Sequence, residues 1–157
     1  MHRNLAWPGT ALATLILLSG CATSVQPPRL GAASPAPLQR CSELGASFNF
    51  ASTRLTATTL EPAGRLANAG QPVEAHCRVT GRMNERVSPV DGQAYAIGFE
   101  MRLPTNWNGR FLYQGNGGTD GNVVTADGGN SLGSGGLLRN ALQKGFAVIS
   151  SDGGHSS

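Results

Sequence analysis

A glycine-rich segment near the end of the chain has the composition that oxyanion-binding chemistry requires. Residues 115–121 contain four glycines and follow a short apolar stretch that ends at Gln114. Glycines directly after a strand let the backbone turn and expose its amide N–H groups, which can stabilise the oxyanion of acyl transfer. Losing one such donor typically costs about 10²–10³ in turnover. A glycine-rich turn with no catalytic role is the alternative interpretation.

A second polar segment, residues 150–157, combines serines, an aspartate and a histidine behind an apolar stretch. Residues 154–157 would begin a G-x-S-x-G nucleophile elbow around Ser156 if a glycine followed them. Alternatively, the segment is a loop at a strand end, where Asp152 and His155 bond to the backbone and shape the floor of a site. The glycine-rich segment is neither a Walker loop nor a dinucleotide-binding fingerprint.

Strands and one amphipathic segment must position these two loops. Residues 94–103 alternate in period two, which predicts a half-buried strand, and residues 110–114 predict a second short strand. Residues 137–144 space their apolar side chains as on one face of a helix, and Gly145 would end that helix. Residues 146–151 form a nearly continuous apolar run, which is typical of a buried parallel strand.

The predicted strand at residues 94–103 has two different faces. One face carries Ile97, Phe99, Met101 and Leu103, and the other carries Ala96, Gly98, Glu100 and Arg102. Upstream, residues 53–60 and 73–80 also have strand composition, and residues 82–93 contain a proline and an Asp-Gly pair that indicate a hairpin. Strand, glycine loop, helix and strand form a βαβ unit. We therefore expect an α/β fold that is rich in strands at its N-terminal part and incomplete at Ser157.

The N-terminus has the pattern of an exported lipoprotein. Arg3 precedes an apolar run over residues 5–18, which suits a secretory signal and falls short of the roughly 20 residues that span a bilayer. The run ends at a Leu-Ser-Gly triplet before Cys21, which resembles a lipobox whose cysteine receives a diacylglyceryl group. An ordinary cleaved signal with a chance cysteine is the alternative. Since Ala22 follows in place of an aspartate, known sorting rules indicate the outer membrane, facing the periplasm.

Behind a signal peptide of residues 1–20, we expect a tether and one domain. Residues 21–40 contain four prolines and no apolar period, which predicts a semi-extended spacer. Residues 41–157 have about the length of one small domain. Charged residues make up 13% of the chain, against a typical value of about 25%, and the basic residues are scattered. Nucleic-acid binding therefore has little support.

The three cysteines fit an oxidising compartment. If Cys21 carries lipid, Cys41 and Cys77 remain as an even pair, and we expect them to form a disulfide. Two buried free thiols are the alternative. No CxxC or HxxxH spacing occurs, so we expect neither a metal site nor a cofactor in this chain.

Five motifs together resemble the tannase and feruloyl esterase family. They occupy residues 77–81, 97–104, 106–111 (NWNGRF), 114–118 (QGNGG) and 151–155 (SDGGH). Their order and approximate spacing fit the family over residues 41–157. The NWNGRF stretch joined to the QGNGG loop is the specific part of the resemblance.

The resemblance implies an α/β-hydrolase domain with an inserted lid, which cleaves esters of phenolic acids or terephthalate monoesters by Ser-His-Asp acyl transfer. It places the nucleophile, the other triad residues and the lid, with the calcium that the lid often binds, beyond Ser157. It also matches Cys41 and Cys77 to the family's N-terminal disulfide.

The same resemblance assigns roles to two loops. The glycine loop is similar to the family's oxyanion loop, with Gly117 and Gly118 as the amide donors. The segment that contains Asp152 and His155 is similar to a structural motif of the family, which argues against Ser156 as the nucleophile.

We therefore expect the N-terminal part of an exported serine esterase that acts on small aromatic carboxylic esters and is held at a membrane by its lipid anchor. By itself this part should be inactive, because the triad is missing from it. A non-catalytic periplasmic lipoprotein that uses the same β-rich front end for binding is the alternative function.

Overall fold

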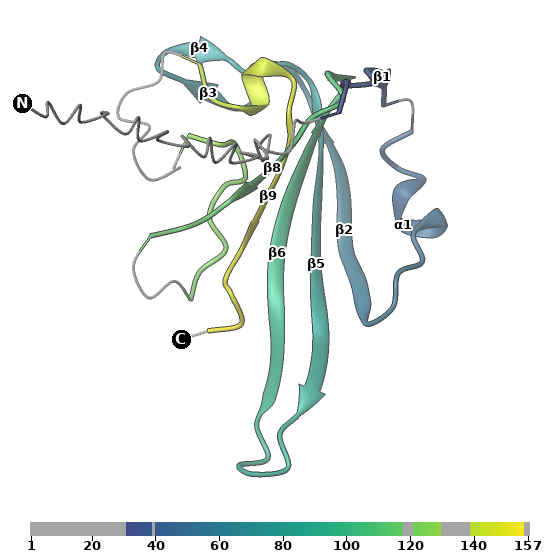
Figure 1. Ribbon diagram of the computed structural model, residues 1–157, viewed down its shortest axis with the longest axis vertical. Helices are drawn as coiled ribbons and strands as arrows, with labels where there is room; N and C mark the ends of the chain where they lie inside the picture. Colours follow the sequence, from purple (N-terminus) through teal and green to yellow (C-terminus); the bar gives the residue numbers. More distant parts are fainter. Residues whose placement is uncertain (1–30, 39, 118–120, 130–138, 156–157) are drawn as a thin grey trace, which may run out of the picture. The chain divides into compact units, whose positions relative to one another are not determined.

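The computed structural model describes residues 31–38, 40–117, 121–129 and 139–155, and its elements lie in a compact unit that starts at Ala32. The expected signal peptide, Cys21 and most of the tether lie outside these described residues. Five strands form one mixed sheet in the order β2-β5-β6-β9-β8 (Figure 1). They are β2 (Thr53–Glu61), β5 (His76–Val87), β6 (Ala94–Pro104), β8 (Phe111–Gln114) and β9 (Ala147–Ser151).

Shorter elements flank this sheet. They are β1 (Ala36–Pro37), α1 (Leu44–Ser47), β3 (Ala67–Asn68), β4 (Gln71–Pro72), β7 (Asn106–Trp107) and the 3₁₀ helix η1 (Leu142–Lys144). Strand β1 pairs with β7, and Leu38 donates its amide hydrogen to Thr105 O at 2.9 Å. The end of the segment that we expected to be a spacer is therefore part of the folded unit. Among the described residues, none of the helices has the length and apolar character needed to cross a membrane.

The predicted hairpin is confirmed. Strands β5 and β6 are antiparallel neighbours, and residues 88–93 connect them. The strand predicted at residues 73–80 begins at His76 and runs on to Val87. Strand β2 pairs with β5 only as far as Met83, and β9 pairs with β6 over residues 99–102, so the hairpin projects beyond the sheet (Figure 1).

The parallel pair predicted from the βαβ pattern is also confirmed. Strands β8 and β9 run in parallel with Gln114 opposite Ser150, and β9 lies antiparallel to β6. The carboxyl ends of parallel strands meet at the same edge of a sheet, where α/β proteins place their ligands. The glycine loop after Gln114 and the segment after Ser150 therefore emerge side by side.

The helix predicted over residues 137–144 is wrong for the residues that the structure describes. Helical geometry is confined to η1, which ends at Gly145 with φ 83° as expected. The physical reason lies at Asn140, whose Oδ1 accepts from the Gln143 amide at 2.9 Å while Gln143 Oε1 accepts from the Asn140 amide at 3.0 Å. This reciprocal exchange resembles that of a capping box and holds Asn140 outside the turn that η1 forms.

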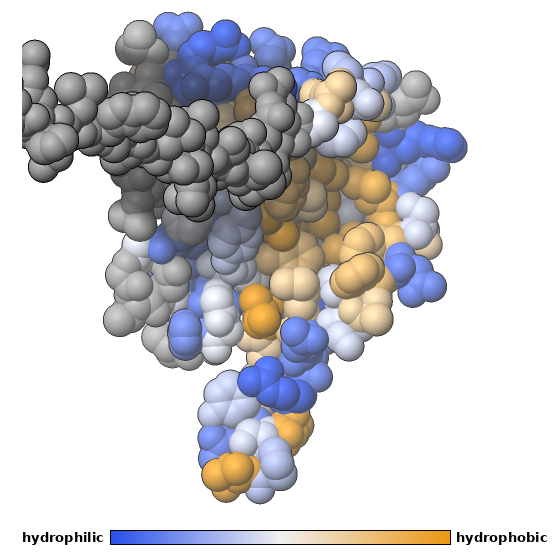
Figure 2. Space-filling model, in the orientation of Figure 1, coloured by the Kyte–Doolittle hydropathy of each residue, from blue (hydrophilic) through white to orange (hydrophobic). Residues whose placement is uncertain are grey.

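The core divides between the two faces of the sheet, because neighbouring residues of a strand point to opposite sides. On β9, Ile149 packs against the first cluster and Val148 belongs to the second. The first cluster centres on Cys41, Cys77, Val79 and Phe99, and the second on Val73, Ala126, Leu142 and Val148. An apolar hollow of about 250 Å³ opens beside the first cluster and is also lined by Phe48 and Phe50. Figure 2 shows the hydrophobic residues gathered between the sheet and the α1 segment.

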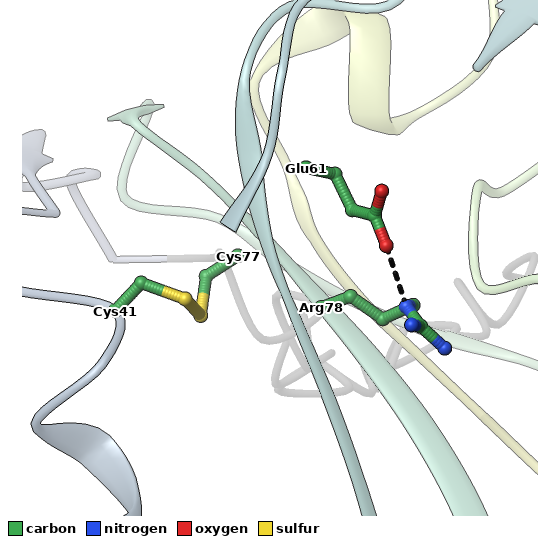
Figure 3. Close-up of a disulfide and its surroundings, with 4 residues drawn as sticks. All are labelled: Cys41, Glu61, Cys77 and Arg78. Atoms are coloured by element: carbon green, nitrogen blue, oxygen red, sulfur yellow. Dashed lines mark hydrogen bonds and ion pairs between the residues drawn. A yellow bond between two sulfur atoms is a disulfide. The ribbon is translucent and has the colours of Figure 1, made fainter. Parts of the chain in front are cut away.

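The predicted disulfide between Cys41 and Cys77 is present, with the two Cα atoms 5.5 Å apart (Figure 3). It ties the segment before α1 to the start of β5. On the neighbouring residue of β5, Arg78 Nε donates to Glu61 Oε1 at 2.7 Å, which joins β5 to β2 across the opposite face.

The second face of β6 differs from the sequence expectation. Alternation predicted a half-buried strand, yet Ala96 and Arg102 are buried as well as Phe99. The loop of residues 121–129 covers this face, and Ala126 N donates to Glu100 Oε1 at 3.0 Å. Both faces of β6 are therefore packed, and the polar residues are tolerated because they bond to one another.

Candidate functional site

The two candidate loops are joined by Asn116, the second residue after the end of β8. Its Nδ2 donates to Ser150 Oγ at 3.0 Å and to Ser151 O at 2.9 Å, so the glycine loop is tied to the end of β9. Ser150 also donates from its Oγ to Asn116 Oδ1 at 3.4 Å. Sequence reasoning treated the two loops as separate candidates, and the structure brings them together.

The glycine loop leaves backbone amides exposed at this edge. Gly115 and Gly117 are both exposed, and within the described residues no hydrogen bond uses the amide N–H of Gly115, Asn116 or Gly117. Gly118, the other expected donor, lies outside the described residues. Free, exposed amides at a strand end are the groups that an oxyanion site requires.

Asp152 is a buried carboxylate that bonds to backbone. Its two oxygens accept from the Gly98 amide at 3.0 and 3.1 Å, and Oδ1 also accepts from the Gly154 amide at 2.8 Å. Its own amide donates to Gly98 O at 3.1 Å. These contacts pin the turn after β9 onto β6.

The described serine and histidine side chains form no triad with this aspartate. Ser150 Oγ is engaged by Asn116, and Ser151 Oγ is 3.0 Å from Tyr113 Oη. The side chain of His155 is exposed, and its backbone amide donates to Asp152 O at 3.2 Å. Ser156 lies outside the described residues.

Gly98→Ala should lower the free energy of unfolding by about 1–3 kcal/mol, because an added methyl displaces the Asp152 carboxylate. A Cβ at Gly98 would lie 2.7 Å from Asp152 Oδ2 and 3.3 Å from Val123 Cγ2. Urea denaturation measures the change. Gly45→Ala is the matched control, because its Cβ would meet only Thr58 at 3.7 Å or more, and it should change stability by less than about 0.5 kcal/mol. Equal effects of the two substitutions would contradict the prediction.

Sequence reasoning missed a buried polar network under the neighbouring loop. Arg102 Nε donates to Glu100 Oε1 and Arg102 Nη1 donates to His76 Nε2, both at 2.7 Å. Since arginine only donates, His76 Nε2 accepts and Nδ1–H donates to Glu74 O at 2.8 Å. Burial lowers the pKa of His76 below its usual value, and the Arg102 cation also lowers it, against the raising effect of the Glu74 carbonyl. The histidine is therefore neutral near pH 7.

Gln114 is the second residue that sequence reasoning passed over. It ends β8 and is 1% exposed. The sequence could have indicated its burial, because Gln114 lies two residues after Leu112 and therefore on the same face of the strand. A polar side chain at such an apolar position needs hydrogen-bond partners. No cluster of three or more histidine, cysteine, aspartate or glutamate side chains among the described residues could hold a metal ion.

The fold and site can be compared with a solved structure. The crystal structure of an esterase from Aspergillus oryzae matches with a TM-score of 0.54 and 24% identity, over 74% of this chain and 22% of that chain. The mixed, strand-rich sheet with few helices therefore shares its fold with part of that structure, consistent with an incomplete α/β-hydrolase sheet. This confirms the predicted fold class.

The family follows from sequence comparison. The family model described as "Tannase and feruloyl esterase" matches residues 77–157, just over half of the chain. The chain belongs to the tannase and feruloyl esterase family, as its motifs indicated. The matched region starts at Cys77, so it covers less than the resemblance that we expected from residue 41 onward.

Three relatives share part of this region. The mono(2-hydroxyethyl) terephthalate hydrolase of Piscinibacter sakaiensis is 44% identical over 82 residues, which are 52% of this chain and 13% of that protein. An uncharacterized esterase of Agrobacterium fabrum is 32% identical over 82 residues, 52% of this chain and 14% of that protein. A probable feruloyl esterase B-2 of Aspergillus flavus is 42% identical over 57 residues, 36% of this chain and 9% of that protein. All three names are those of ester hydrolases, and the chain spans about a seventh or less of the length of these relatives.

Proposed function

We propose that this chain is the front part of an exported serine esterase for aromatic carboxylic esters, and that its glycine loop supplies one half of the oxyanion hole. The observation that carries the proposal is the loop of residues 115–117, in which both glycines are exposed and whose backbone amides have no partner in the described part of the chain. Gly117, with Gly118 after it, is the donor that we assign. A terephthalate or phenolic ester is the substrate class, by similarity to the named relatives.

In this proposal the chain's own residues stabilise charge and hold geometry, and no cofactor takes part. A nucleophile on another segment attacks the ester carbonyl, and negative charge develops on the carbonyl oxygen. The Gly117 amide donates to that oxygen more strongly in the transition state than in the ground state, which lowers the barrier. Asp152 and His155 keep the adjacent turn in shape and take no direct part.

A segment exchange tests the proposal. The aligned 82 residues of the Piscinibacter sakaiensis hydrolase would be replaced by the matching residues of this chain, and hydrolysis of mono(2-hydroxyethyl) terephthalate measured. In the exchanged enzyme, Gly117→Pro removes the N–H and should lower kcat by about 10²–10³ with little change in KM. Gly117→Ala keeps the N–H and is the matched control. The 157-residue chain alone should show no turnover on the same ester.

Equal activity of the two Gly117 variants would contradict the oxyanion assignment. An exchanged enzyme that folds but never turns over would favour the alternative, a non-catalytic binding module. Turnover by the chain alone, sensitive to a serine-directed inhibitor, would show that a nucleophile is already present in it.

We further propose that Cys21 carries the lipid that holds the protein at the outer membrane. Cys21→Ser should move the protein from the membrane fraction to the soluble periplasmic fraction. Stable anchoring needs more than one acyl chain, and the substitution removes the thiol that carries these chains. Fractionation followed by immunoblotting measures the change. Unchanged membrane association of the variant would argue against lipidation of Cys21 as the anchor.

A further inference from the structure

We propose that Gln114 and Asn116 form a clamp that positions the glycine loop, so that the amide of Gly117 is fixed before substrate binds. This inference rests on the proposed function, because positioning the glycine loop matters for catalysis only if the Gly117 amide is an oxyanion donor. Neither residue touches the reacting atoms in this proposal, and both act through the loop backbone.

Gln114 is the inner half of the clamp. Its Oε1 accepts from the Gly128 amide at 2.7 Å, and its Nε2 donates to Thr125 O at 3.1 Å and to Asn116 Oδ1 at 3.3 Å. Both of its amide hydrogens and its oxygen are therefore used, at a position that is 1% exposed. A buried amide with unmet hydrogen bonds is costly, so the side chain holds its partners in one arrangement.

Asn116 is the outer half of the clamp. Its Nδ2 donates to Ser150 Oγ and Ser151 O, at 3.0 and 2.9 Å, and its Oδ1 accepts from the side-chain Nε2 of Gln114. The side chain thus points back onto β9. Within the described residues the backbone amides on either side of it make no bonds and stay exposed.

The clamp is anchored on the buried network. The loop of residues 121–129, which receives Gln114, is itself held on β6 where Ala126 donates to Glu100 Oε1 at 3.0 Å. The Leu142 amide donates to Asp127 O at 3.0 Å and fixes the same loop from η1. Gln114 therefore joins the glycine loop to a part of the protein that is fixed from two further sides. A misplacement of about 1 Å in such a site can cost roughly 10²-fold in rate, which is the purpose that we assign to the clamp.

The first test uses the full 157-residue chain and measures backbone order by ¹⁵N relaxation. Gln114→Leu keeps the volume and removes all three hydrogen bonds, and Asn116→Ala removes the bonds to β9. In both variants the order parameters at residues 115–117 should fall from about 0.85 to below about 0.6. Tyr113→Phe is the matched control, because it removes a hydrogen bond to Ser151 without touching the clamp, and it should leave loop order unchanged.

The second test measures kinetics in the exchanged enzyme described above. Asn116→Ala and Gln114→Leu should each lower kcat at least about tenfold with KM nearly unchanged, and Tyr113→Phe should not. If Gln114→Leu does not fold, Asn116→Ala still tests the proposal, because Asn116 is only half-buried and its substitution should be tolerated. An ordered loop in both clamp variants, or a mobile loop with unchanged kcat where Gly117→Pro does lower kcat, would overturn the inference. If Gly117→Pro keeps full activity while the loop loses order in the clamp variants, the oxyanion assignment fails and the clamp remains as a structural feature.

Discussion

Arg102→Met is expected to lower the free energy of unfolding by about 3–5 kcal/mol, because it leaves a buried carboxylate without its cationic partner. The Arg102 and Glu100 side chains are only 10% and 13% exposed, and their ion pair is 2.7 Å long. The substitution also removes the donor to His76 Nε2, and His76 is completely buried. Urea denaturation at pH 7 measures the loss, with the slope of the transition checked for two-state behaviour.

The matched control for this prediction is Arg54→Met. Arg54 pairs with Glu85 at 2.6 Å, but these side chains are 58% and 41% exposed, so solvent screens the pair and its loss should change stability far less than the loss of Arg102. Adding Glu100→Gln to Arg102→Met should recover part of the lost stability, because the neutral amide still accepts from the Ala126 amide. An Arg102→Met variant no less stable than Arg54→Met would contradict the assigned role of the network.

Removing the disulfide is the second large expected effect. The double substitution Cys41→Ser and Cys77→Ser should lower the free energy of unfolding by about 4 kcal/mol, the chain-entropy value for a loop of this length. Both cysteines are buried in the first core cluster, so the serine hydroxyls add a desolvation cost. Thermal unfolding with and without reductant measures the change.

Two controls make the disulfide result specific. Reductant should destabilise the native chain to about the level of the double variant and should leave that variant unchanged. Cys21→Ser should leave the unfolding transition unaltered. Alkylation of Cys41 and Cys77 in the native chain without reductant, or equal stability of native chain and double variant, would contradict the prediction.

Local patterns were sufficient for the long strand β6, the hairpin that precedes it and the end of the turn at Gly145. The alternation over residues 94–103 predicted β6 almost to the residue, and the proline with its Asp-Gly pair predicted the hairpin before it. Gly145 was predicted as the residue that ends a helical turn, and it has the required left-handed conformation. These features depend on neighbours in sequence, which is why a sequence reveals them.

Contacts between distant segments decided the rest. Glu100 and Arg102 have charged side chains, which predicts exposure, yet residues 121–129 cover them and supply a partner. The same holds for the turn at η1. There Asn140 and Gln143 exchange hydrogen bonds, and Asp127 O, from a distant loop, accepts from the Leu142 amide. A periodic pattern indicates which side chains could face a core, but it does not indicate which distant segment packs against them.

For the candidate site, the sequence by itself determined the family, the glycine loop and the two paired cysteines, because each is a matter of residue type and spacing. Only the tertiary structure decided that Asn116 ties that loop to β9, that Gln114 is buried beneath it and that Asp152 bonds to Gly98. The physical reason is that β8 and β9 are separated by a long crossover in the chain and yet lie parallel in the sheet, so their loops meet in space only after the sheet has formed.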